Sequence, residues 1–306
     1  MTSTIKIISV NANATRGRKY PVDQILIDVQ GVQGDVHAGS LRPVSMMDIA
    51  AAERFYLITG AQPLEYGSFA ENITFETDQE LDARIFDRFL GEDVLLEVVF
   101  KGKPFHDQFR DPGHYLMPRE GLFCRVFKGG MLKAGDEMKF LPKVFNIKII
   151  TLSDRAFRGV YDDRSGPVIT KMVETLFSKL NWRFDISTQI MPDDEMLLEE
   201  QLTSELTQHT DLIITTGGTG IGPRDITPDI MRKFIQKEIP GIMEMIRWKY
   251  GVEKPTALVS RAIAGVSGQT LLFALPGSVK AVTEYMTEIS KHIEHLYYMI
   301  HAVELH

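Results

Sequence analysis

Residues 211–229 read DLIITTGGTGIGPRDITPD, and this stretch decides more about the fold than any other in the chain. Its apolar start is typical of a buried strand. Gly217, Gly218 and Gly220 follow, and they allow positive φ angles and a close approach of the backbone to a ligand. Thr219 adds a hydroxyl, and successive turn amides can form an anion-binding concavity. A strand that ends in such a turn is typical of open α/β sheets, which bind ligands at the carboxyl ends of their strands.

Charged residues follow these glycines at once. Arg224 and Asp225 place a cation and a carboxylate beside the turn, and Thr227 opens a helix-like segment. Taken alone, the same residues are compatible with a tight turn that carries a surface ion pair of little consequence. Residues at the other strand ends of the same sheet are needed to distinguish a ligand-binding turn from a purely structural one.

The second half of the chain alternates strand-like and helix-like segments. The strand-like segments are 146–152, 184–190, 212–215 and 270–275. The helix-like segments are 165–180, 195–208, 227–236 and a long closing one at 278–300. In the first of these helices the apolar residues recur about every 3.6 positions. The alternation predicts a three-layer α/β domain in which helices cover both faces of a mostly parallel sheet.

Three further clusters of chemically active residues stand at ends of these strands. They are Ser153-Asp154-Arg155, Pro192-Asp193-Asp194 and Leu275-Pro276-Gly277-Ser278. Because the carboxyl ends of parallel strands lie along one edge, we expect these clusters to meet the glycines in one cleft. Arginine and backbone amides suit phosphate oxygens, and aspartates suit Mg²⁺. Asp193-Asp194 and Ser278 are also good helix N-caps, so that simpler role stays open.

The first half of the chain has a different pattern. Short strand-like segments at 22–29, 94–100, 122–127 and 137–140 are separated by glycines, which predicts a β-rich barrel or a sandwich. One helix is expected at 46–59, with Ser45 as its N-cap. The change of pattern near Leu141-Pro142-Lys143 predicts two domains, 1–142 and 143–306.

Polar residues among the glycine turns of the first half are further site candidates. These candidates are Asp35, His37, Arg42, Glu71, Asn72 and His106. They are equally explained as turn residues of a small barrel. A metal site from His37 and His106 with a carboxylate has no helical spacing to support it.

Composition excludes several classes of protein. The chain has 306 residues, of which 25% are charged, and a formal net charge of −7, which argues against broad nucleic-acid binding. Cys124 is the only cysteine, so an internal disulfide and a multi-cysteine zinc site are excluded. No apolar run of about 18 residues predicts a membrane span, and no signal peptide is recognised. A cytoplasmic protein is the expectation.

The strand-end clusters together resemble the molybdopterin adenylyltransferase family. The resemblance covers about residues 146–306 and rests on the Ser-Asp-Arg, Pro-Asp, glycine-rich and Leu-Pro-Gly-Ser segments quoted above. It implies a three-layer α/β domain, usually trimeric, that transfers AMP from Mg-ATP to the phosphate of molybdopterin. One departure is Ala274, which stands where the family commonly has asparagine.

The resemblance also implies roles for individual residues. Asp193 and Asp225 correspond to carboxylates that organise Mg²⁺ and take part in catalysis. The glycine-rich stretch corresponds to the phosphate and pterin contacts, and Ser278 to a contact on the pterin side. The remaining substrate-binding candidates are Ser153, Asp154, Arg224, Thr227, Pro276 and Gly277.

The first half resembles a MOSC domain, named for the C-terminal domain of molybdenum-cofactor sulfurase. Gly-Asp-Val-His-Ala-Gly at 34–39 and Phe-Ala-Glu-Asn-Ile-Thr at 69–74 carry this resemblance. It implies a β-barrel that binds molybdenum cofactor or carries sulfur, often through a cysteine. In the fused versions that cysteine follows Gly-Lys-x, whereas here Phe105 and His106 follow Gly102-Lys103-Pro104.

Both resemblances indicate molybdenum cofactor biosynthesis, with molybdopterin and ATP as partners and other molybdenum-cofactor enzymes as further candidates. Two alternatives stay open. Instead of an enzyme that transfers AMP, the chain would be a pterin-binding scaffold without catalysis or a sulfur-carrier module. The paired carboxylates favour the enzyme, because binding alone does not require them, and the missing cysteine argues against the sulfur carrier.

Overall fold

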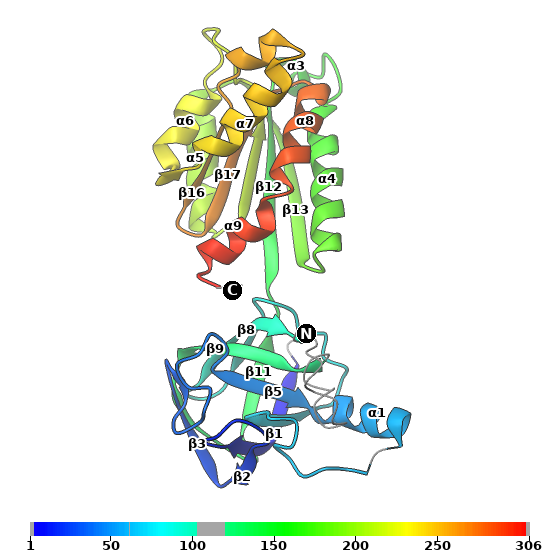
Figure 1. The fold of residues 1–306 in the computed structure, drawn as a ribbon. Coiled ribbons are helices and arrows are strands. Elements are labelled where there is room, and N and C mark those ends of the chain that lie inside the picture. The colour runs from blue at the N-terminus through cyan, green and yellow to red at the C-terminus, as the bar shows by residue number, and fades with distance from the viewer. Residues whose placement is uncertain (1–2, 61, 103–119, 304–306) are drawn as a thin grey trace. The chain divides into compact units, whose positions relative to one another are not determined.

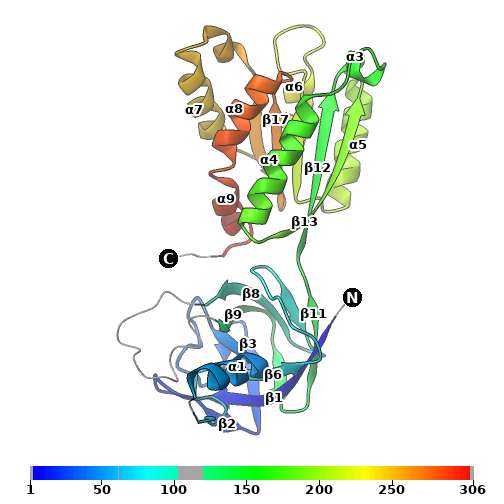
Figure 2. The same ribbon diagram turned by 90° about the vertical axis from the view of Figure 1, so that its right-hand side faces the viewer.

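The computed structural model describes residues 3–60, 62–102 and 120–303. The chain divides into two compact units, Met1–Lys143 and Val144–His306. Figures 1 and 2 show both units from two directions. Each unit has its own sheets and its own core, and each is described by itself.

The first unit contains a closed barrel of seven strands. Its order is β11-β7-β8-β9-β5-β6-β1, and β1 pairs again with β11. The strands are β1 (Thr4–Ala12), β5 (Val44–Asp48), β6 (Ile73–Thr77), β7 (Arg88–Leu90), β8 (Leu95–Lys101), β9 (Leu122–Lys128) and β11 (Glu137–Leu141). The sequence left a barrel and a sandwich open, and this closed ring decides for the barrel.

Period-two alternation places one face of each barrel strand inside. In β11, Met138 and Phe140 are buried whereas Glu137 and Lys139 are exposed. The buried residues join a core that includes Phe75 and many aliphatic side chains. Strand β2 (Tyr20–Val22) extends the barrel beyond β1, and β10 (Gly130–Lys133), β3 (Gln24–Asp28) and β4 (Gly31–Val32) form a separate small sheet.

Helix α1 (Ile49–Thr59) begins later than the sequence pattern predicted. Its N-cap is Asp48, whose carboxylate accepts a hydrogen bond from the amide of Ala50 at 3.0 Å. The predicted N-cap, Ser45, lies inside β5 and is paired with Phe123 of β9. Because β5 is paired on both sides, its backbone groups bond in the sheet and cannot start a helix. The predicted start at Met46 was therefore wrong.

The second unit is built on a six-stranded sheet of order β13-β12-β14-β17-β16-β15. Its strands are β12 (Val144–Leu152), β13 (Arg183–Met191), β14 (Leu212–Thr216), β15 (Lys237–Glu238), β16 (Ile263–Ser267) and β17 (Thr270–Leu275). The first four in the order are parallel, and β16 and β15 are antiparallel to their neighbours. The chain passes from β12 to β13 on one side and then to β14 on the other, so the strand order reverses at β12 and β14. Doubly wound sheets bind ligands at such a reversal.

Helices cover both faces of this sheet, as Figures 1 and 2 show. One layer holds α5 (Glu195–Thr207) and α6 (Thr227–Phe234), and the other holds α4 (Ser165–Lys179), α7 (Pro240–Gly251), α8 (Val279–Ile289) and α9 (Ile293–Ile300). On the first face, Leu202 and Met231 pack in one core cluster with Ile213 of the central strand. The predicted three-layer α/β architecture is confirmed. The short helix α3 (Asp154–Phe157) and a 3₁₀ turn at Pro255–Val259 complete the unit.

The predicted closing helix at 278–300 is two helices. The amides of Lys291 and His292 bond to carbonyls three residues back, those of Glu288 and Ile289. This tighter turn ends α8 and starts α9 in a new direction. The single long helix was therefore a wrong prediction, since the apolar pattern continues through the break.

An aromatic cluster anchors α9 at the amino end of the sheet. Phe145 at the start of β12 stacks on Trp182 with ring centroids 4.7 Å apart and meets Tyr297 of α9 edge-on at 4.8 Å. The hydroxyl of Tyr297 donates a hydrogen bond to the carbonyl of Asp211 at 2.9 Å. Since this anchor occupies the amino end, the carboxyl end of the parallel strands stays available for the turns that carry the predicted site residues.

Candidate active site

The glycine turn, residues 217–222 after β14, passes against the end of β12. Gly217 and Gly218 have φ angles of 103° and 60°, which residues with a side chain rarely adopt. A Cβ at Gly217 would lie 2.2 Å from the carbonyl oxygen of Leu152. A Cβ at Gly277, in the turn after β17, would lie 3.2 Å from Cα of Gly217. The glycines are therefore needed because three strand ends pack closely.

Successive amides of the glycine turn have no acceptor within the described ranges. The amide of Gly217 donates to the carbonyl of Leu275 at 3.0 Å, but those of residues 218–221 donate to no group in residues 3–60, 62–102 and 120–303. Carbonyls of the turn are occupied, since Gly217 O accepts from the hydroxyl of Thr227 at 2.9 Å. Adjacent amides left in this way form an anion-binding concavity.

Asp154 and Asp193 join the ends of β12 and β13. The amide of Asp154 donates to the Asp193 carboxylate at 3.2 Å, and the amide of Asp193 donates to the Asp154 carboxylate at 3.3 Å. Arg224, which follows the glycine turn, forms an ion pair with Asp154 through a side chain that is 62% exposed. Three predicted site residues from three different segments are thus in direct contact.

The carboxyl of Asp193 has a perturbed proton affinity. Burial raises the pKa of Asp193 above its ordinary value, and the negative charges of Asp154 and Asp225 raise it further. The hydrogen bond from the amide of Asp154 and the positive charge of Arg224 oppose this rise. Because like charges surround Asp193, a cation placed among them would stabilise the ionised form.

Asp225 is turned toward its own loop. Its carboxylate accepts a hydrogen bond from the amide of Gly222 at 2.8 Å. A Cβ at Gly220 would lie 2.6 Å from the same carboxylate oxygen. Asp225 therefore braces the glycine turn, and it influences Asp193 by its charge.

The other predicted residues of this unit have local bonding roles. Ser153 caps α3 and its hydroxyl lies 2.9 Å from that of Tyr161. Ser278 caps α8, and Asp194 caps α5. The simpler N-cap role left open for Ser278 is therefore real, whereas in the Asp193-Asp194 pair the second residue is the cap. Pro276 offers its carbonyl to the hydroxyl of Thr216 at 2.9 Å.

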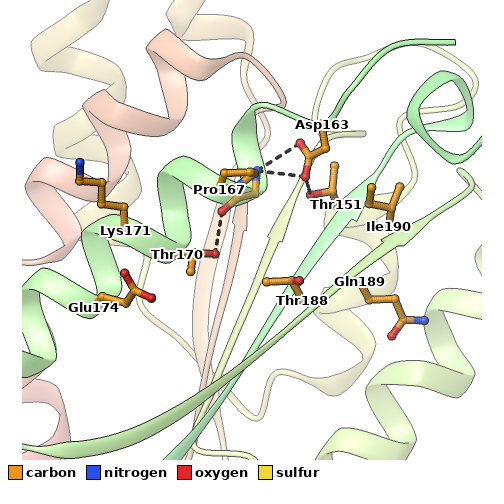
Figure 3. Close-up of a pocket in the computed structure, with 10 residues that line it drawn as sticks. Thr151, Asp163, Pro167, Thr170, Lys171, Glu174, Thr188, Gln189 and Ile190 are labelled. Atoms are coloured by element: carbon orange, nitrogen blue, oxygen red, sulfur yellow. Dashed lines mark hydrogen bonds between the residues drawn. The ribbon is translucent and has the colours of Figure 1, made fainter. Parts of the chain in front are cut away.

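A pocket of about 820 Å³ opens beside these strand ends, between α4 and the edge strand β13 (Figure 3). Thr151 lies at its upper end, and its hydroxyl donates to Asp163 at 2.7 Å. Thr188 and Ile190 of β13 and Lys171 of α4 also line it. Thr151 and Ile190 lie one residue before the last residues of β12 and β13, the strands that are followed by Asp154 and Asp193, although these two aspartates do not line the pocket.

Sequence reasoning missed Thr151 and Asp163 as pocket residues and Arg261 beside the glycine turn. Thr151 sits within a predicted strand, and Asp163 belongs to none of the strand-end clusters that the sequence singled out. Arg261 follows the 3₁₀ turn and donates from Nε to the carbonyl of Gly220 at 2.6 Å. Only the fold brings this arginine to the turn, because 40 residues of chain separate them.

In the first unit, Asp35 belongs to a buried ion pair. Its carboxylate lies 2.9 Å from the ammonium of Lys19, and the two side chains are 0% and 1% exposed. Asp35 also accepts from the amide of Asn13 at 3.2 Å and from the side-chain amide of Asn72 at 3.1 Å. These bonds tie turns together in the interior and leave Asp35 no exposed surface for a ligand.

Glu71 and Asn72 are likewise buried and bonded. Glu71 accepts from the amides of Gly67 and Phe69 at 2.6 and 3.1 Å, and burial raises its pKa. Asn72 accepts from the amide of Ser45 at 3.1 Å. The barrel-turn interpretation therefore describes these residues better than the ligand-site interpretation.

The exposed candidates of the first unit are His37 and Arg42. His37 is 37% exposed, with Nδ1 3.3 Å from Asp35. The guanidinium of Arg42 lies 3.8 Å from the ring centroid of Phe100, and burial lowers its pKa. His106 and the segment after Gly102 fall outside the described residues. Cys124 is fully buried, and burial raises the pKa of its thiol.

Within the described ranges, no group of three or more histidine, cysteine, aspartate or glutamate side chains could hold a metal ion. The proposed histidine site of the first unit therefore has no support in the part of the chain that is described. In the same ranges, no helix is long and apolar enough to span a membrane.

Comparisons with known proteins place the second unit in a class. Residues 148–295 match the family model described as "Probable molybdopterin binding domain". The chain is 36% identical over 149 residues to a molybdopterin adenylyltransferase of Helicobacter pylori J99, covering 48% of this chain and 82% of that protein. It is also 36% identical over 141 residues to the Escherichia coli K12 molybdopterin adenylyltransferase, covering 45% and 70%. The chain belongs to the molybdopterin adenylyltransferase family.

Solved structures were found for the same half of the chain. The tungsten cofactor synthesizing protein MoaB from Pyrococcus furiosus is 34% identical and covers 53% of this chain and 99% of its own, with a TM-score of 0.46. The molybdopterin biosynthesis Mog protein from Mycobacterium ulcerans is 34% identical and covers 51% and 99%, with a TM-score of 0.47.

The packing of Gly217 predicts a sharp effect of a methyl group. Gly217→Ala would push the turn away from Leu152 and misplace its amides, so we expect inorganic pyrophosphate binding to weaken about ten-fold or more. The matched control is Gly268→Ala, which has a φ of 57° but open space around its Cβ. It should cost about 1 kcal/mol of stability and leave binding unchanged. Titration calorimetry would test this, and equal binding by both variants would contradict it.

The buried ion pair predicts a pH dependence for the first unit. Although burial acts to raise the pKa of Asp35, hydrogen bonds from His37 and Lys19 hold it below its ordinary value. Its stabilising effect is therefore present above about pH 4 and is lost as the pH falls below that. Asp35→Asn should destabilise the barrel by about 3–5 kcal/mol at pH 7.

The difference in unfolding free energy between Asp35→Asn and the parent chain should become smaller at acid pH. Hydrogen exchange of β1 and β6 amides in the full chain measures the unfolding free energy of this unit alone. Asp93→Asn, which removes an exposed ion pair with Lys128, is the control. A difference that stays constant from neutral to acid pH would refute the assignment.

Proposed function

We propose that this chain transfers AMP from ATP to the phosphate of molybdopterin and releases pyrophosphate. The observation that carries the proposal is that the amides of residues 218–221, which have no acceptor among the described residues, lie beside Asp193, where a Cβ at Gly218 would be 3.7 Å from the carboxylate that is bonded to Asp154. Membership of the molybdopterin adenylyltransferase family supports the same reaction.

The reaction joins two anions, so the site has to reduce their repulsion. A bond forms between an oxygen of the molybdopterin phosphate and the α-phosphorus of ATP, and the bond from that phosphorus to the bridging oxygen of pyrophosphate breaks. The amides of residues 218–221 and the exposed guanidinium of Arg224 are suited to bind phosphate oxygens. Catalysis of such a transfer is mainly positioning and charge stabilisation. No cysteine nucleophile exists in this unit, and none is required.

The pterin would occupy the pocket beside the carboxylate pair. Its volume of about 820 Å³ lies in the range of small-molecule sites. Thr188 and the hydrogen-bonded pair Thr151 and Asp163 line it with polar side chains, which suits the polar edge of a pterin ring. A pterin bound there would extend its phosphate past the ends of β12 and β13 toward Asp193, where it would have to meet ATP.

Mg²⁺ fits the donor set of the site. Asp193 and Asp225 offer hard carboxylate oxygens, and burial together with the negative charges of Asp154 and Asp225 raises the pKa of Asp193. Mg²⁺ is usually held by one or two carboxylates together with substrate phosphates. When bound, it would neutralise charge on the phosphates. In this proposal Asp193 holds the ion, and Asp225 assists while it braces the glycine turn.

For the barrel unit, we propose binding of a molybdenum-cofactor species in a MOSC-like domain, with His37 and Arg42 as its anion contacts. Sulfur transfer is disfavoured because Cys124 is buried in the core with a raised thiol pKa. The homotrimer implied by the family resemblance stays a prediction, as do other molybdenum-cofactor enzymes as partners. Sedimentation of the full chain would test the trimer.

Adenylylation is tested by pyrophosphate release from ATP and molybdopterin with Mg²⁺. Asp193→Asn should lower turnover about 10²-fold, the scale for losing one preorganised electrostatic group, and Asp225→Ala should do likewise. Asp194→Asn is the matched control, because asparagine caps a helix as well as aspartate does. Normal turnover by Asp193→Asn would contradict the role proposed for Asp193. Binding of molybdopterin without any pyrophosphate release by the parent chain would favour the scaffold alternative.

The surroundings of Asp193 also predict two opposite pH shifts. Its ionised form is the active one, so kcat/KM should fall as the pH drops through its raised pKa. Asp154→Asn removes a charge that raises this pKa, and the acid limb should move to lower pH. Arg224→Gln removes a charge that lowers it, and the limb should move to higher pH. Shifts in the same direction for both variants would contradict the assignment.

A further inference from the structure

Arg261 connects the glycine turn to the rest of the second unit. Its backbone amide donates to the carbonyl of Thr219 at 2.9 Å, and its Nε donates to the carbonyl of Gly220 at 2.6 Å. One terminal nitrogen donates to the carbonyl of Asp225. The other binds both carboxylate oxygens of Asp229 on α6, at 2.9 and 2.8 Å. Every branch of the guanidinium therefore has a partner.

These bonds determine which way the peptides of the turn face. In a trans peptide the carbonyl and the following N–H point in opposite directions. Since the carbonyls of Thr219 and Gly220 point at Arg261, the amides of Gly220 and Ile221 point away from it. These are two of the amides that find no acceptor among the described residues. Arg261 thus binds one side of the turn while the other side stays free for an anion.

We propose that Arg261 is a positioning residue that preorganises the amides of the glycine turn for the phosphates of ATP. This rests on the proposed adenylyl transfer and adds how the phosphate site is held. Arg261 itself does not touch the substrate in this proposal. It acts through the peptide groups of residues 219–221 and, by its bond to the Asp225 carbonyl, through the loop that carries Asp225.

A glycine turn needs such a brace. Glycine has the largest backbone freedom of any residue, so an unbraced turn would have to be ordered by each ligand that binds. Preorganised donors avoid that cost and are the main source of electrostatic stabilisation in active sites. Asp225 stabilises the turn by accepting a hydrogen bond from the amide of Gly222. Arg261 stabilises it from a different segment by donating to its carbonyls.

The site specifically requires arginine. The planar fork of a guanidinium can bind two carbonyls and a carboxylate at fixed angles, whereas lysine presents one compact charge on a flexible stem. Asp229 holds the far side of the fork and is 56% exposed, so it adds orientation more than buried charge. Replacing Arg261 by lysine should therefore fail to restore the function of the turn.

The test compares Arg261→Ala, Arg261→Lys and Asp229→Asn in the full chain. Arg247→Ala is the matched control, because Arg247 lies nearby and donates a single bond to the carbonyl of Ala262 at 3.1 Å. Binding of inorganic pyrophosphate is measured by titration calorimetry, and AMP transfer is measured as pyrophosphate release. Each measurement on Arg261→Ala is repeated with added methylguanidinium, and hydrogen exchange of β14 reports on folding.

We expect Arg261→Ala and Arg261→Lys to weaken pyrophosphate binding about ten-fold or more. KM for ATP should rise by a similar factor, while kcat changes less. Asp229→Asn should show a smaller effect of the same kind, and Arg247→Ala none. Methylguanidinium should restore much of the binding to Arg261→Ala but not to the parent chain, which already has its guanidinium.

Unchanged pyrophosphate binding in Arg261→Ala would overturn the proposal. A loss that methylguanidinium does not reverse, accompanied by lost protection of β14, would assign Arg261 a purely structural role and overturn it as well. If the parent chain releases no pyrophosphate from ATP and molybdopterin, the proposed function fails. The calorimetric comparison then still decides whether Arg261 organises an anion site, so the two failures are distinguishable.

Discussion

The close approach of Gly217 to the carbonyl of Leu152 is the contact on which the second unit's site depends. It occurs where the strand order reverses, between the ends of β12 and β14. No side chain fits there, so the chain must turn with a positive φ. The next amides then have no partners within the turn, and Gly277 can pack against the same point. A constraint on one Cβ thus leaves a row of amides without acceptors among the described residues.

Charge around this contact is arranged in two opposite ways. The amides of residues 218–221 and the exposed Arg224 carry positive charge or partial charge, whereas Asp154 and Asp193 are joined by reciprocal hydrogen bonds that hold two negative charges together. Burial raises the pKa of Asp193, the charges of Asp154 and Asp225 raise it further, and the positive charge of Arg224 opposes this rise. A phosphate substrate binds together with a metal cation. Such a substrate requires hydrogen-bond donors for its oxygens and carboxylates for its cation, side by side.

The first unit shows that a motif rich in glycine and charge can be structural. Asp35 and Lys19 form a buried ion pair between turns of the first unit, and Glu71 and Asn72 bond to backbone groups. Buried polar groups of this kind are fully satisfied, so they specify how the turns close instead of binding a ligand. The glycine turn of the second unit differs because, in the part of the chain that the structure describes, the amides of residues 218–221 have no acceptor.

The sequence by itself determined the alternation of strands and helices, the glycine turn and the polar residues at the strand ends, because burial pattern and positive φ are local properties of the chain. Only the tertiary structure decided that Asp154 pairs with Asp193, that Asp225 faces its own loop, and that Arg261 reaches the carbonyl of Gly220. It also decided that Asp48, and not Ser45, caps α1, because pairing of β5 on both sides overrides local helix signals. Such contacts join segments far apart in the chain, and residue spacing contains no information about which of them meet.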